Sequence, residues 1–271
     1  MATEPELPPI VEEVTRHYLT VADEEVPGLV DGLYLIGSVA LDDFRPGASD
    51  IDFVAVTKTP ADAGAMAALR RLHRRVRAGH RRPGLDGIYV TWDDLAADPR
   101  TVPPGPRVHG GRVGGPSMAG RHPVAWQEMA GYAHAFRGPE RGEFAVWTDA
   151  KALREFTLAN LDGYWRRWHR RHGSPLTPWG LAALGTWVPA WGVLGVSRLR
   201  YLLDTGQITS KEGAGVYARA HLDARWHPII DECLRIRRDE PGPARLSAAQ
   251  RRRDALSYVA TMIAETGRSS A

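Results

Sequence analysis

Two aspartates, Asp50 and Asp52, stand two positions apart at the start of an apolar run, and the pair Gly37-Ser38 closes the apolar run before it. Alternate residues of a strand share a face, so the two carboxylates are expected to lie side by side. A divalent cation between them would offset their repulsion, and Mg²⁺ prefers such hard oxygen ligands. A glycine lets backbone N–H groups approach an anion, and the Ser38 hydroxyl can join them. These residues predict a site for magnesium and a nucleotide phosphate.

A third acid, Asp86, could join this pair. It lies at the start of another apolar run, and this strand could run beside the one that carries Asp52. The alternatives are that Asp86 is only a turn residue, or that Asp93 or Asp94 is the third acid, although these two fit a helix N-cap better. A solvated turn could also contain paired aspartates, but it would not explain why both share a face. The strands expected to position the site are residues 33–36, 51–56 and 85–92.

The length of 271 residues exceeds that of a typical single domain, and we expect two domains, residues 1–147 and 148–271. Strand and helix patterns share the first part, whereas the second part has helical patterns throughout, so an α+β class is predicted.

Glycine and proline dominate residues 99–123. We expect no regular core element there, because long irregular segments are usually binding loops or lids.

Charge and composition limit the partners. The net charge is +3 and the pI about 9.2, but the densest arginine cluster, Arg70 to Arg77, has helical spacing, which favours a solvated face. No apolar run could cross a bilayer, and the N-terminus lacks the basic and then apolar pattern of a secretory signal. We therefore expect a cytoplasmic protein without a membrane partner. A solvated arginine face is favoured over nucleic-acid binding, which stays as the alternative. The one cysteine, Cys233, excludes an internal disulfide and a cysteine-rich metal site.

The chain resembles the nucleotidyltransferase (polymerase-beta-like) superfamily, whose signature is Gly-Ser…Asp-x-Asp. The resemblance is carried by the Gly-Ser pair, a spacer and Ser-Asp-Ile-Asp at 49–52. The resemblance implies an N-terminal nucleotidyltransferase domain with a mixed sheet. It also implies that Asp50 and Asp52 bind Mg²⁺, while Gly37, Ser38 and Ser49 help to bind the nucleotide. In such sites a carboxylate on a neighbouring strand either binds metal or removes the proton of the attacking hydroxyl, and the third acid named above fits that position.

The chain also resembles one branch of that superfamily. The resemblance is carried by residues 196–201 and 205–211, the strand around Asp86 and the Arg-Gly-Pro turn at 137–139. This branch is the aminoglycoside adenylyltransferases that modify streptomycin and spectinomycin. It implies a C-terminal helical domain that closes over ATP, Mg²⁺ and the antibiotic. AMP passes to an antibiotic hydroxyl, pyrophosphate leaves, and resistance results. The residues that match Arg198 and Lys211 contact the ATP phosphates in this family, and two such cations would help to neutralise a triphosphate.

The sequence departs from the family at two places. The family has a glutamate as base at the position of Asp86, so this shorter acid must come closer to the hydroxyl or act through water. Within an apolar helix expected at 179–203, the family places acidic residues that grip the antibiotic. This chain has Leu184 and Val188 there, flanked by Trp187 and Trp191. Nucleotide transfer is therefore better supported than the identity of the acceptor.

Three residues are candidates for contacting the acceptor, namely Trp126, Asp162 and Trp187. Trp126 could stack on a substrate, although its residue type fits a buried aromatic at least as well. A carboxylate from Glu128, Glu155 or Asp162 could pair with the cationic groups of an aminoglycoside. The alternatives are a nucleotidyltransferase that acts on a different hydroxylated small molecule or on a protein, and an inactive nucleotide-binding or antitoxin-like homologue.

Overall fold

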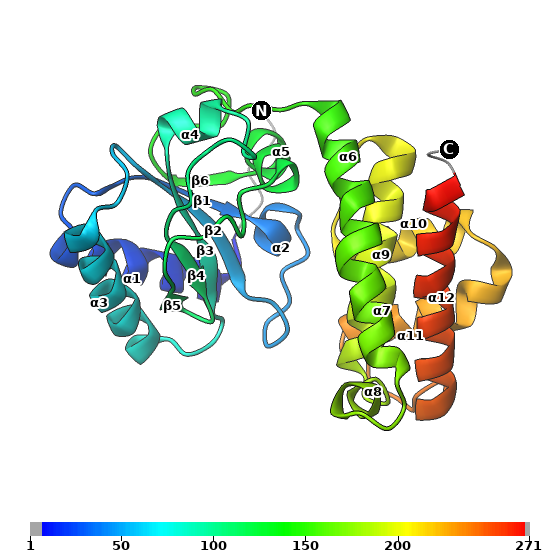
Figure 1. Ribbon diagram of the computed structural model, residues 1–271. Helices are drawn as coiled ribbons and strands as arrows, with labels where there is room; N and C mark the ends of the chain where they lie inside the picture. Colours follow the sequence, from blue (N-terminus) through cyan, green and yellow to red (C-terminus); the bar gives the residue numbers. More distant parts are fainter. Residues whose placement is uncertain (1–6, 269–271) are drawn as a thin grey trace, which may run out of the picture. The chain divides into compact units, whose positions relative to one another are not determined.

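The computed structural model describes residues 7–268, and the chain divides into two compact units, Met1–Asp149 and Ala150–Ala271 (Figure 1). This division lies two residues beyond the expected one, which fell between residues 147 and 148. The first unit combines a sheet with helices, and the described part of the second contains helices only. The predicted α+β class is confirmed, with a mixed sheet followed by an all-α helical bundle.

The described part of the first unit contains six strands, β1 (Val30–Ile36), β2 (Ile51–Thr57), β3 (Leu85–Thr91), β4 (Arg107–His109), β5 (Arg112–Val113) and β6 (His134–Arg137). They form one sheet in the order β5-β4-β3-β2-β1-β6. β2 and β3 are parallel, and the other neighbouring strands are antiparallel. This order places the two strands predicted to carry the acids next to each other.

Helices cover both faces of this sheet. They are α1 (Pro9–Glu25), α2 (Gly37–Ala40), α3 (Ala63–Gly79), α4 (Trp92–Ala96) and α5 (Pro123–Gly131). Phe53 and Ala55 of β2 belong to a core shared with α1 and α3, whereas Val54 and Val56 belong to a second core that includes residues of α4 and α5. Because alternate residues point to opposite faces, a strand buried on both sides becomes almost wholly apolar. The polar residues Asp50 and Asp52 therefore mark the end of the buried stretch.

The prediction of no regular element in residues 99–123 is wrong in part, because β4 and β5 lie there. A buried arginine secures the segment. The Arg121 guanidinium donates to the carbonyl of Tyr89 in β3 at 2.5 Å and to that of Ser117 at 3.2 Å. Glycine is needed at 105, since a Cβ there would overlap this guanidinium. The side chain of Arg121 thus anchors a segment whose sequence lacks apolar periodicity.

The second unit is a helical bundle. Its helices are α6 (Ala150–Asn160), the π-helical turn η1 (Leu161–Trp165), α7 (Arg166–Gly173), α8 (Pro178–Ala182), α9 (Trp187–Thr205), α10 (Lys211–His221), the 3₁₀ turn η2 (Ala224–Trp226), α11 (His227–Arg237) and α12 (Ala248–Arg268). α9 packs against α10, α11 and α12. Gly192 and Gly195 allow Trp168 and Trp165 to lie directly on its backbone, where a Cβ would overlap the rings. No helix among residues 7–268 has the length and apolar character needed to cross a membrane.

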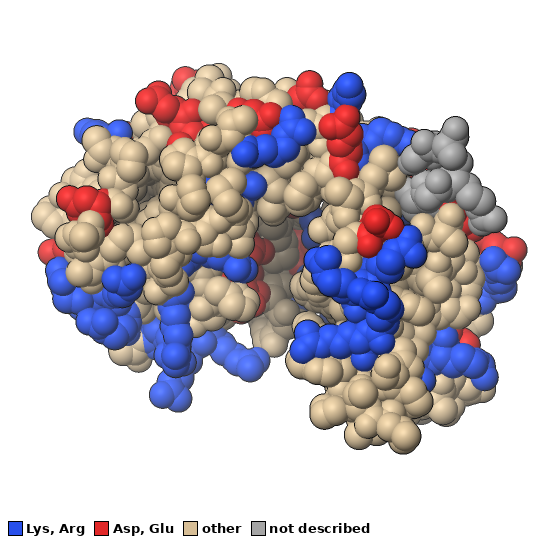
Figure 2. Space-filling model, viewed as in Figure 1, with Lys and Arg blue, Asp and Glu red and all other residues tan. Residues whose placement is uncertain are grey.

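Arginine side chains gather on the surface over α3 and, in the other unit, over α7 (Figure 2). On α3, Arg71 and Arg75 both bind the carboxylate of Glu25 in α1, at 3.1 and 3.0 Å, while Leu72 and Val76 are buried. The helix is therefore amphipathic, with its arginines outside. This agrees with the solvated face expected for Arg70 to Arg77.

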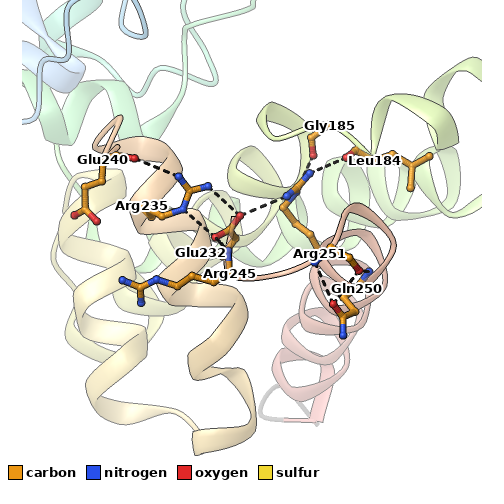
Figure 3. Close-up of polar contacts among 9 residues, drawn as sticks. Leu184, Gly185, Glu232, Arg235, Glu240, Arg245, Gln250 and Arg251 are labelled. Carbon is orange, nitrogen blue, oxygen red and sulfur yellow. Dashed lines mark hydrogen bonds and ion pairs between the residues drawn. The ribbon is translucent and has the colours of Figure 1, made fainter. Parts of the chain in front are cut away.

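A buried ionic network ties α11 to the rest of the helical unit (Figure 3). Glu232 is 0% exposed and accepts two hydrogen bonds from Arg235, at 3.0 and 3.1 Å, and lies 3.4 Å from Arg251. Burial alone would raise the pKa of Glu232, but the hydrogen bonds from Arg235 and from the Arg245 N–H outweigh it and lower the pKa. Arg251 also binds the carbonyls of Leu184 and Gly185. The network thus secures the break between α8 and α9, where a single helix was predicted over 179–203.

Replacing Glu232 with glutamine is expected to destabilise the helical unit by about 3 kcal/mol, because Arg251 would stay buried without its counter-charge. Urea unfolding would measure the loss. The matched control is Asp231→Asn, one residue earlier on the same helix, which breaks a more exposed pair with Arg219. That change should cost less than about 1 kcal/mol. Equal losses in the two variants would show that the buried network carries no special share of stability.

The core of the first unit contains a polar chain of three side chains. The hydroxyls of Tyr18 and Tyr89 lie 2.8 Å apart, and His73 Nε2 lies 2.8 Å from the Tyr89 hydroxyl. Burial lowers the pKa of His73 to about 3, so the imidazole stays neutral in the folded unit. The chain satisfies three polar groups that would otherwise be costly to bury.

Acid should therefore weaken the first unit. Above pH 6.5 His73 is neutral in the folded and in the unfolded protein. Below pH 6.5 His73 takes up a proton in the unfolded chain, whereas in the folded unit it accepts a proton only near pH 3. Stability is lost across this window, by about 2 kcal/mol at pH 5 for this one group. Hydrogen exchange of the β2 and β3 amides at pH 7 and pH 5 would measure it. His73→Gln should remove this part of the pH dependence, whereas His80→Gln, at the end of the same helix, should retain it.

Candidate active site

The register of the sheet lines up the acidic residues. Ile36 at the end of β1 pairs with Asp52 of β2, and Asp52 pairs with Asp86 of β3. Paired residues on neighbouring strands point to the same face, so the carboxylates of Asp52 and Asp86 lie side by side. Ile36, Asp52 and Asp86 thus form a row across the sheet. The row continues onto β4, where His109 contacts Asp86. The expectation that the strand of Asp86 runs beside that of Asp52 agrees with this register.

Gly37 begins α2 immediately after β1 and lies against Asp52. Its φ is +64°, in the left-handed region, and a Cβ on it would overlap Asp52 Oδ2. Only glycine meets both conditions without strain. Ser38 follows in the same turn, and its carbonyl accepts the Asp43 N–H at 2.8 Å. The Gly-Ser pair therefore places the backbone of α2 directly beside the carboxylate of Asp52.

Asp50 is exposed just before β2, and its Oδ1 accepts the N–H of Gly84 at 3.3 Å. A Cβ on Gly84 would lie 2.9 Å from the same oxygen. Both carboxylates of the Asp-x-Asp pair are thus flanked by glycine backbone. Ser49 has another local role, since its hydroxyl accepts the Arg45 N–H at 3.0 Å and closes the loop that leads to Asp50.

The carboxylates of Asp50 and Asp52 suit magnesium, which is commonly held by one or two carboxylates together with substrate phosphates. The glycines at 37 and 84 leave room beside these oxygens that a side chain would fill. Within residues 7–268, however, no group of three or more His, Cys, Asp or Glu side chains is arranged to hold a metal ion by itself. The hypothesis that the third acid converges with the pair around a metal is therefore not supported, because Asp86 is bound by other groups.

Asp86 is held by the hairpin of β4 and β5. Its Oδ2 lies 2.7 Å from Nδ1 of His109, and its Oδ1 accepts the Gly110 N–H at 2.7 Å. His109 is not among the site residues predicted from the sequence. The available signal was the Gly-Gly pair after it, which favours a tight hairpin turn and so places the residue before it on a strand.

The predicted residues of the helical unit form a group of their own. Arg198 of α9 donates to the Thr209 carbonyl at 3.0 Å, just before α10, and Lys211 is the first residue of α10. The Lys211 ammonium lies 4.6 Å from the centre of the Trp191 ring, and Trp191 stacks on Trp187 at 5.3 Å. One face of α9 and α10 therefore brings together the two cations and an aromatic pair, of which Trp187 is 65% exposed.

Trp126 and Asp162, the two further candidates for acceptor contact, differ in their exposure. The prediction for Trp126 is wrong, because the residue is 0% exposed in the core on the α5 side of the sheet, and its indole N–H bonds to the carbonyls of Asp94 and Ala97. Asp162 is exposed and forms an ion pair with Arg166 at 2.6 Å. It is accessible, but an arginine already partly neutralises it.

Comparison with known proteins matches both units. A family model described as "Nucleotidyltransferase domain" matches residues 16–82, and one described as "Aminoglycoside adenylyltransferase, C-terminal domain" matches residues 181–265. The first range contains the Gly-Ser and Asp-x-Asp motifs, and the second contains Arg198 and Lys211. No match was found among curated proteins.

The fold is also similar to a solved structure, "spectinomycin adenyltransferase AAD(9) from Enterococcus faecialis with ATP and spectinomycin". The TM-score is 0.66 at 12% sequence identity, and the similarity covers 93% of this chain and 99% of that chain. At this identity the likeness concerns the fold, and the two matched domains carry the assignment. The chain is a nucleotidyltransferase that belongs to the aminoglycoside adenylyltransferase family.

Proposed function

We propose that the protein transfers AMP from ATP to a hydroxyl of an aminoglycoside or related antibiotic of the streptomycin or spectinomycin type. The reaction depends on Mg²⁺, releases pyrophosphate and confers resistance. The observation that carries this proposal is the register of the sheet, which lines up Asp52 and Asp86 beside the Gly37 turn. The similar fold of AAD(9), a protein solved with ATP and spectinomycin, supports the choice of co-substrate and acceptor.

In the first unit, Asp50 and Asp52 would hold magnesium, and Ser38 with the backbone near Gly37 would bind the β- and γ-phosphates. When bound, the cation supplies neutralisation of the charge on the triphosphate and its leaving group. Asp86, next to Asp52 in the sheet, supports the removal of the proton from the acceptor hydroxyl. Ser49 contributes through the loop that it closes before Asp50.

In the helical unit, Arg198 and Lys211 would contact the phosphates of ATP. Both are fixed by neighbours, Arg198 by the Thr209 carbonyl and Lys211 by the face of Trp191. Cations held in this way lose little side-chain entropy when they meet an anion. Trp187, exposed beside Trp191, and Asp162 are the proposed contacts to the acceptor.

A different hydroxylated small molecule is the second candidate acceptor. The residue at position 184 is an exposed leucine and that at 188 is a buried valine, where the family resemblance leads us to expect acids. Beside these positions Trp187 stacks on Trp191, and Trp187 is exposed. Such a surface binds sugar rings and apolar faces as readily as it binds cations.

Mass spectrometry after incubation with ATP, Mg²⁺ and a panel of acceptors tests the proposal. The panel should contain streptomycin, spectinomycin, other aminoglycosides and hydroxylated compounds without amino groups. An adenylyl adduct on streptomycin or spectinomycin, formed only with Mg²⁺ and accompanied by pyrophosphate, is the expected result. An adduct restricted to the compounds without amino groups would favour the second candidate. Binding of ATP without any adduct would contradict an enzymatic role.

A further inference from the structure

Both carboxylate oxygens of Asp86 already have partners. Oδ1 accepts the Gly110 N–H and Oδ2 faces Nδ1 of His109, each at 2.7 Å. The Asp86 side chain is only 18% exposed, whereas that of His109 is 77% exposed. Of the two groups, the imidazole is the one that a hydroxyl can reach.

The backbone fixes the imidazole in this position. His109 pairs with Arg112 across the hairpin, so Gly110 and Gly111 form a two-residue turn. Their φ values are +57° and +66°, as a type I′ turn requires, and this turn matches the twist of the flanking strands. The N–H of Gly110, within the turn, binds the same carboxylate as the imidazole. Asp86 thus binds the turn and the histidine together.

The hydrogen bond also sets the tautomer. Since the Asp86 carboxylate accepts hydrogen bonds, Nδ1 of His109 carries the proton of the neutral ring and Nε2 keeps its lone pair. A carboxylate that orients an imidazole in this way also stabilises the imidazolium formed when Nε2 takes a proton. Two further charged residues lie near the turn, namely Arg112, opposite His109 on β5, and Arg77 of α3, beside Gly111.

We propose that His109, oriented by Asp86, accepts the proton of the acceptor hydroxyl, and that Asp86 acts through it as a positioning residue. The inference rests on the proposed function. As the hydroxyl oxygen forms a bond to the α-phosphorus, its proton passes to Nε2 of His109. The bond from the α-phosphorus to the bridging oxygen breaks, and the electron pair leaves with pyrophosphate. The imidazolium then returns its proton to solvent. The imidazole supplies the reach that an aspartate lacks relative to a glutamate.

His109→Ala should lower kcat for adenylyl transfer by about 10²- to 10⁴-fold, the usual contribution of a general base, with little change in the KM for ATP. His109→Gln should be equally slow, because its amide can bind Asp86 but cannot take up a proton. Added imidazole should restore part of the activity of His109→Ala and none of that of His109→Gln. A group that only supports the hairpin would not be rescued in this way.

Two further variants complete the test. His109→Ala combined with Asp86→Asn should be no slower than the slower of the two single variants, because the pair acts as a unit. His80→Ala removes another histidine of the first unit, outside the row, and should keep the wild-type rate. Wild-type kcat in His109→Ala, with Asp52→Asn inactive, would overturn this inference and leave the proposed function intact. No transfer by the wild-type protein to any acceptor would overturn both.

Discussion

Asparagine in place of Asp52 is expected to slow adenylyl transfer by about 10³-fold or more, because a catalytic metal contributes several kcal/mol to the transition state. The amide keeps the shape of the side chain and removes the negative charge proposed to bind magnesium. Asp50→Asn should have an effect of the same order, since the two residues share this role. The rate of Mg²⁺-dependent pyrophosphate release in the presence of an acceptor is the measurement.

Asp93→Asn is the matched control. Asp93 is an exposed aspartate of the same unit and was a rival candidate for the third acid, but it follows β3 at the end opposite to Asp86. Its replacement should leave the rate within about twofold of wild type, as expected for a surface change away from the reacting groups. All three variants should unfold at similar urea concentrations. Turnover near the wild-type rate in either Asp50→Asn or Asp52→Asn would remove the metal-site assignment.

The part of the candidate site that the sequence predicts well is local. The two-residue spacing of Asp50 and Asp52 follows from the period of a strand, and apolar runs predicted β2 and β3 to within one residue of their ends. The pairing of Asp52 with Asp86 is not local. Consecutive strands are often neighbours in a sheet, so few other strand pairings were possible.

The part that was missed depends on contacts between distant residues. His109 lies in a glycine- and proline-rich segment and meets an acid 23 positions earlier. Neither apolar period nor charge cluster marks it. Arg121 is similar, because a buried arginine that bonds to backbone carbonyls looks like a surface arginine in the sequence. Side-chain hydrogen bonds of this kind are specified by three-dimensional packing and leave no periodic signal.

Residue type also misleads where burial decides the role. Tryptophan is suited both to a core and to a stacking surface, so the sequence could not separate Trp126, which is buried, from Trp187, which is exposed. The break between α8 and α9 was missed for a related reason. The segment from 179 to 196 is almost wholly apolar, and the carbonyls of Leu184 and Gly185 at the break are satisfied by Arg251 from α12. A distant residue therefore allows an irregular turn within an apolar run.

Alanine in place of Gly37 is expected to slow transfer by about 10²-fold or more, because a displacement of about 1 Å in a reacting group can have this effect. The new Cβ would overlap Asp52 Oδ2, so that this carboxylate must move away from its place beside Asp86. The left-handed backbone adds a cost of about 1–2 kcal/mol in folding stability. Steady-state rates and urea unfolding of the same variant would separate the two effects.

Gly28→Ala is the variant that isolates the displacement of Asp52. Gly28 has a φ of +73°, close to the +64° of Gly37, but a Cβ on it would meet nothing within 4 Å. Both variants should lose stability through the left-handed strain that they share, and only Gly37→Ala should lose activity. Equal rates in both would mean that the position of Asp52 is not critical, and the glycine would then serve only the turn. A rate loss confined to Gly37→Ala would show that the backbone of the Gly-Ser turn sets the position of the carboxylate, because strain is common to both variants.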